Sequence, residues 1–62
     1  MAFRVEYTDP MDGPTRWSAP DGTRQWDTGD DAEAAVRADG TTGVYYAITN
    51  IETGDPDRGI QL

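Results

Sequence analysis

One run of residues, Gly43 to Glu52, limits the fold more than any other part of this sequence, because β-branched and aromatic side chains crowd it. Such residues favour a strand. Alternation would place Val44, Tyr46 and Ile48 on one face. The other face would carry Tyr45, Ala47, Thr49 and Ile51. A strand that is apolar on both sides needs cover on both. We expect a helix on one face, and on the other either a folded-over hairpin or another protein chain.

The N-terminal segment shows the alternation of a half-buried strand. In Ala2–Thr8, the side chains of Phe3, Val5 and Tyr7 point one way and the charged residues between them point the other. The following segment, Asp9–Pro14, is predicted to be a loop, since proline cannot donate to a strand ladder.

Two tryptophans mark a predicted hairpin. Thr15–Ala19 is centred on Trp17 and Arg24–Asp27 contains Trp26, and both segments resemble short strands. Between them, residues 20–22 (Pro-Asp-Gly) are typical of a tight turn. We therefore expect the two tryptophans to lie near each other.

A single helix is predicted between Thr28 and Gly40. Thr28 is a favourable N-cap and Gly40 suits the left-handed position after a helix. Carboxylates of the first turn, which complement the helix dipole, are Asp30, Asp31 and Glu33. At 100° per residue the buried face consists of Ala32, Ala35 and Val36. Glu33 and Arg37 lie opposite, spaced to form an i,i+4 ion pair.

After a turn at residues 53–56, Arg58–Leu62 is predicted to form a last short strand. The expected fold is a single small α+β domain over residues 1–62, in the order β-β-β-α-β-β. Its short connections favour an antiparallel sheet with one short helix packed on one face.

The charge of the chain is strongly negative. Twelve acidic residues face five arginines and no lysine, which gives a net charge of −7. This charge repels phosphate backbones and anionic lipids, so we expect no direct nucleic-acid partner and no membrane partner. The acidity fits three origins: a GC-rich composition, a surface adapted to high salt, or an acidic patch that docks on a basic protein. The candidates for such a patch are Asp27, Asp30, Asp31, Glu33, Asp55 and Asp57.

The residue types leave little room for catalysis. Without cysteine, histidine or lysine, the chain lacks the usual ligands of zinc and the usual bases and Schiff-base formers. Ser18 has no evident base, the glycines form no phosphate-binding motif, and the acidic clusters lack the register of a calcium loop. We therefore predict no enzymatic activity, no cofactor and no metal site.

No apolar run is long enough to span a bilayer, and the N-terminus does not resemble a signal peptide. A cytoplasmic location is the expectation.

These features favour a non-enzymatic protein-interaction domain whose partner is another protein or, in a homodimer, a second copy of the chain. A nucleic-acid-mimicking inhibitor that docks on a basic cleft, and an accessory protein with a halophilic-type surface, are the alternatives. Tryptophan, tyrosine and arginine concentrate binding energy at interfaces. The interface candidates are accordingly Arg16, Trp17, Arg24, Trp26 and Tyr45.

Overall fold

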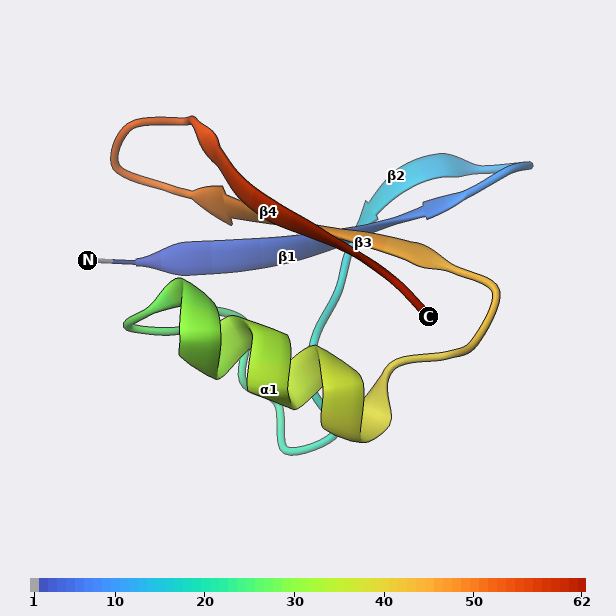
Figure 1. Cartoon of the computed structure of the whole chain (residues 1–62), viewed down its shortest axis with the longest axis horizontal. Coiled ribbons are helices and arrows are strands. Elements are labelled where there is room, and N and C mark those ends of the chain that lie inside the picture. The colour runs from blue at the N-terminus through green and yellow to red at the C-terminus, as the bar shows by residue number, and fades with distance from the viewer. Residues whose placement is uncertain (1) are drawn as a thin grey trace.

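The computed structural model describes residues 2–62 and contains four strands and one helix (Figure 1). The elements are β1 (Phe3–Asp9), β2 (Gly13–Arg16), α1 (Gly29–Asp39), β3 (Tyr45–Asn50) and β4 (Pro56–Gln61). Every strand pairs antiparallel, in the order β2-β1-β3-β4. The predicted α+β class and the small antiparallel sheet are confirmed. The predicted order β-β-β-α-β-β is wrong, because the helix follows the second strand and only two strands precede it.

The two central strands supply most of the core. β1 and β3 pair in a register that sets Val5 opposite Ile48 and Tyr7 opposite Tyr46. Val5 and Ile48 are fully buried, and Tyr46 is only 2% exposed. Alternation in both strands therefore delivers the apolar side chains to one face, as the sequence pattern predicted.

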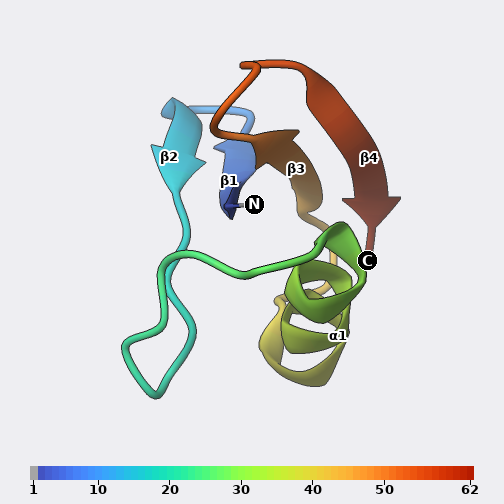
Figure 2. The ribbon, with the colours of Figure 1, turned by 90° about the vertical axis from the view of Figure 1, so that its left-hand side faces the viewer.

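The helix packs under this face of the sheet (Figure 2). Thr28 caps it as predicted, because its hydroxyl accepts the amide hydrogen of Asp31 at 3.0 Å. Ala32 and Val36 are fully buried against the sheet. Because the buried face is made of small side chains, the helix contributes little apolar area of its own, and packing against the sheet must stabilise it.

The segment between β2 and α1 is not the predicted third strand. The amide of Trp17 donates to the carbonyl of Val5, and the chain then leaves β1 for a loop. It returns at Trp26, which exchanges two backbone hydrogen bonds with Phe3, at 2.8 and 2.9 Å. Both tryptophans thus pair with β1 rather than with each other, and Arg24–Asp27 contributes one bridge instead of a strand.

Two other boundaries differ from the prediction. β1 continues to Asp9 and β2 starts at Gly13, so that only residues 10–12 form the turn between them. β4 begins at Pro56, inside the predicted turn, because a shift in register after Ile48 lets the chain pair across a bulge at Asp57.

Gly40 is not left-handed, contrary to the prediction. Its backbone is extended, with φ −68° and ψ 151°. The glycine is required by space instead, because a Cβ there would collide with the backbone oxygen of Val36 and the side chain of Leu62.

The opposite face of the sheet has neither a helix nor the tryptophan loop over it in the described part of the chain (Figure 2). Of the two alternatives predicted for this face, cover by a folded-over hairpin is therefore wrong, and cover by another protein chain stays a prediction. Instead the ring of Tyr45 lies across Gly59 of the neighbouring strand, where a side chain at position 59 would meet it. An aromatic ring over a glycine of an edge strand shields the exposed backbone.

Candidate interaction surfaces

One end of the molecule concentrates the negative charge. The helix start and the β3–β4 turn lie together at this end, on the left in Figure 1. We call it the acidic end, and its carboxylates belong to Asp27, Asp30, Asp31, Glu33, Glu52, Asp55 and Asp57. The arginines here are Arg4, which pairs with Thr49 beside the β3–β4 turn, and Arg58. The other five carboxylates share the rest of the described chain with three arginines, so the surplus of negative charge is larger at the acidic end.

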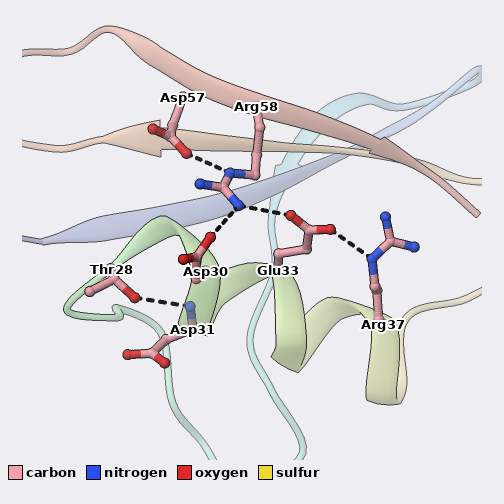
Figure 3. Close-up of polar contacts among 7 residues, drawn as sticks. All are labelled: Thr28, Asp30, Asp31, Glu33, Arg37, Asp57 and Arg58. Carbon is pink, nitrogen blue, oxygen red and sulfur yellow. Dashed lines mark hydrogen bonds and ion pairs between the residues drawn. The ribbon is translucent and has the colours of Figure 1, made fainter.

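Arg58 ties β4 to the helix at the acidic end (Figure 3). Its Nη1 donates to Asp30 Oδ1 at 2.7 Å and to Glu33 Oε1 at 2.8 Å, and its Nε donates to Asp57 at 2.7 Å. The second oxygen of Glu33 accepts from Arg37, also at 2.7 Å. The result is a chain of alternating charges that runs from the edge strand along the helix.

These contacts shift the pKa values of Glu33 and Arg58. The hydrogen bond from Arg58 is the main cause that lowers the pKa of the Glu33 carboxyl below its ordinary value of 4.5, and the bond from Arg37 lowers the pKa further. Glu33, then Asp30 and Asp57, raise the pKa of Arg58 by hydrogen bonding. Glu33 and Arg58 therefore both stay charged at neutral pH.

The indole rings of Trp17 and Trp26 stack, with centroids 5.8 Å apart and planes inclined by 18°. The predicted proximity of the two tryptophans is therefore confirmed. The predicted tight turn between them is closed by hydrogen bonds from Gly22 N–H to the Ala19 carbonyl and from Ala19 N–H to the Thr23 carbonyl, but the segments that carry the tryptophans do not pair as strands. Trp17 also meets the ring of Tyr46 edge-on, at 6.0 Å and 80°. Both indoles are half-buried against the core.

A hollow of about 350 Å³ opens beside Trp17, on the helix side of the sheet. Its lining residues are Tyr7, Asp9, Trp17, Thr41, Val44 and Tyr46. Tyr7 and Tyr46 incline their rings by 55°, with centroids 6.3 Å apart. We call this feature the aromatic hollow.

The structure separates the interface candidates of the sequence rather than gathering them. Trp17 and Trp26 lie on the helix side of the sheet, whereas Tyr45, 45% exposed, lies on the opposite face. Arg16 is opposite Glu6 on that second face, and Arg24 is exposed in the loop between the tryptophans. The six acidic candidates, by contrast, all lie at the acidic end.

Sequence reasoning missed Arg58 and the aromatic hollow. The sequence pattern predicts only a strand at Arg58, and its partners Asp30 and Glu33 lie 28 and 25 positions away in the chain. The alternation in the sequence predicts that Tyr7 and Tyr46 each share a face with the apolar residues of their strand. The position of Trp17 beside them depends on its backbone hydrogen bond to Val5 of β1, which the alternation does not predict.

No known family model matches this sequence, and comparison with curated proteins and with solved structures gave no significant match. In residues 2–62 no group of three acidic side chains is arranged to hold a metal ion. The helix in this part of the chain is too short and too polar to cross a bilayer.

Proposed function

We propose that this chain is a non-enzymatic interaction domain that docks its acidic end on a basic surface of another protein. The observation that supports the proposal most is the uneven charge, seven carboxylates against Arg4 and Arg58 at one end. A field of one sign over a small surface steers an oppositely charged partner and accelerates association. A cytoplasmic location is part of this proposal.

The arrangement of the acidic end suits docking because part of it is rigid. Arg58 fixes Asp30, Glu33 and Asp57 in one geometry. Asp27, Asp31 and Asp55 are exposed and take part in none of the ion pairs among the described residues. The fixed carboxylates would define the position of a partner, and the exposed ones would meet its cations.

Two triple variants of equal net charge test the proposal. One removes charge from the acidic end by Asp27→Asn, Asp31→Asn and Asp55→Asn. The matched control removes the same charge elsewhere by Asp12→Asn, Asp21→Asn and Asp39→Asn. Each variant is three charges less negative than the −7 of the native chain.

Affinity capture from the host lysate, with quantification of each bound protein, gives the readout. We expect a basic partner that the native chain and the control retain and that the acidic-end variant loses. Equal loss by the two variants would show that net charge, rather than the acidic end, governs binding. Displacement of the captured partner by duplex DNA would favour a nucleic-acid mimic over a docking domain that leaves the nucleic-acid site free.

Self-association is the second form of the proposal, and the open face of the sheet around Tyr45 favours it. An exposed aromatic side chain on a face without cover is a candidate contact between copies. The like charge of two copies opposes such a dimer at low ionic strength. Sedimentation equilibrium at low and high salt tests this form, which requires a dimer that Tyr45→Ala disrupts.

A further inference from the structure

The aromatic hollow lies at the other end of the molecule from the acidic end. It is bounded by the C-terminal end of β1 and the start of β3, near the C-terminus of α1. Its volume of about 350 Å³ is at the small end of the range of ligand pockets. The hollow therefore has room for a small ligand or for the end of one long side chain.

The rings around the hollow are held in place. The ring of Tyr46 is fixed at its far end, because its hydroxyl accepts the amide hydrogen of Thr41 at 2.6 Å. Trp17 is fixed between the stacked ring of Trp26 and the edge-on contact with Tyr46. Since these rings are ordered before any ligand arrives, binding would cost little side-chain entropy.

Asp9 contributes the one charged side chain in the lining. Its Oδ1 accepts the amide hydrogen of Met11 at 2.8 Å. None of the ion pairs among residues 2–62 involves Asp9, in contrast to the carboxylates around Arg58. The hollow thus combines the half-buried rings of Tyr7 and Trp17 and the almost fully buried Tyr46 with a carboxylate that no arginine neutralises.

From this combination we infer that the aromatic hollow is a binding site for an alkylammonium group, such as the end of a methylated lysine or a small quaternary amine. Aromatic rings attract cations through their quadrupole, and the carboxylate of Asp9 adds a counter-charge. The net charge of −7 draws cations to the molecule. This site is independent of the acidic end and of the function proposed for it.

The geometry favours an ammonium over the guanidinium of an arginine. A guanidinium binds a carboxylate best through two parallel hydrogen bonds, which require both oxygens. One oxygen of Asp9 is already engaged by Met11. A methylated ammonium needs no hydrogen bond and interacts with rings and charge alone.

Choline and its neutral carbon analogue, 3,3-dimethyl-1-butanol, form the decisive pair of probes, because they have the same shape and differ in charge. Amide chemical shifts are followed during each titration, with sodium chloride at matched ionic strength as the control. We expect saturable shifts at Thr41, Val44 and the indole N–H of Trp17 with choline, and at least tenfold weaker binding of the alcohol. Equal binding of the two probes, or shifts that sodium chloride reproduces, would overturn the inference.

A peptide amide of trimethyllysine and the unmethylated lysine amide distinguish the two sources of the ligand. Tighter binding of the trimethyllysine compound than of choline assigns the hollow to a modified protein tail, and the reverse order assigns it to a free small amine. If none of these ammonium compounds gives saturable shifts in the folded protein, the inference is wrong.

Variants complete the test. Tyr7→Leu should weaken choline binding about five- to tenfold, the loss expected for one cation–π contact. Asp9→Asn should also weaken it, whereas Asp12→Asn removes the same charge from the adjacent turn and should leave it nearly unchanged. Equal effects of the two asparagine variants would mean that net charge alone attracts the ligand. Dispersion of the amide spectrum shows in each case whether the variant is folded.

Discussion

The guanidinium of Arg58, on the edge strand β4, donates to the carboxylate of Glu33, on α1, across 2.8 Å. The helix contributes only the short apolar side chains of Ala32 and Val36 to the core, so this polar contact adds a second link between the two layers (Figure 3). Gly29 leaves room for the link, because a Cβ at the first position of the helix would force the side chains of Asp57 and Arg58 to shift.

Arg58→Gln should therefore lower the melting temperature more than Arg37→Gln does. Arg58 bonds three carboxylates from two elements, whereas Arg37 is 58% exposed and bonds Glu33 within the same helix. Thermal unfolding followed by circular dichroism at low salt measures the difference. Equal shifts for the two variants would show that the link to the sheet adds no stability.

The stability of the fold should decrease as the pH falls below about 4.5. The pKa of Glu33 is lower in the folded state than its ordinary value of 4.5. The carboxylate thus stabilises the fold fully above that value, and the contribution disappears as the pH falls through the folded-state pKa. Urea unfolding between pH 6 and 3 measures this. Glu33→Gln should make the free energy of unfolding depend less on pH in this range. If the dependence is unchanged, the Glu33 carboxylate does not stabilise the fold in this way.

Gly40→Ala should destabilise the domain by about 1–3 kcal/mol, the usual effect of forcing an extra methyl into a packed site. The new Cβ would press on the carbonyl of Val36 and on Leu62. Because the backbone at Gly40 is extended, alanine adopts the conformation without strain and the loss reports crowding alone. When Leu62 is replaced by alanine, Gly40→Ala should cost less stability, because one of the two crowded contacts is gone. Chemical denaturation of the native chain, the two single variants and the double variant measures this coupling between the two positions.

Added sodium chloride should raise the melting temperature, as expected for a surface adapted to high salt. At roughly 1 M the Debye length falls to about 3 Å, so the mutual repulsion of carboxylates at the acidic end is screened. The triple variant at Asp27, Asp31 and Asp55 should respond less to salt than the control triple variant. If the two respond alike, the crowding of charge at the acidic end does not limit stability.

The sequence by itself determined the local structure. The alternation of Phe3, Val5 and Tyr7 and the spacing of Ala32 and Val36 were sufficient to predict a buried strand face and a buried helix face. Thr28 was sufficient to predict the start of the helix. These features depend on neighbours within a few residues, and side-chain periodicity encodes them directly.

Only the tertiary structure decided which distant segments meet. Trp26 pairs with Phe3 rather than with the segment around Trp17, because β1 offers a free edge along which both tryptophans can satisfy their backbone groups. Arg58 reaches Glu33 because of the order of the strands. The acidic end and the aromatic hollow both arise in this way, from residues that periodicity cannot relate to one another.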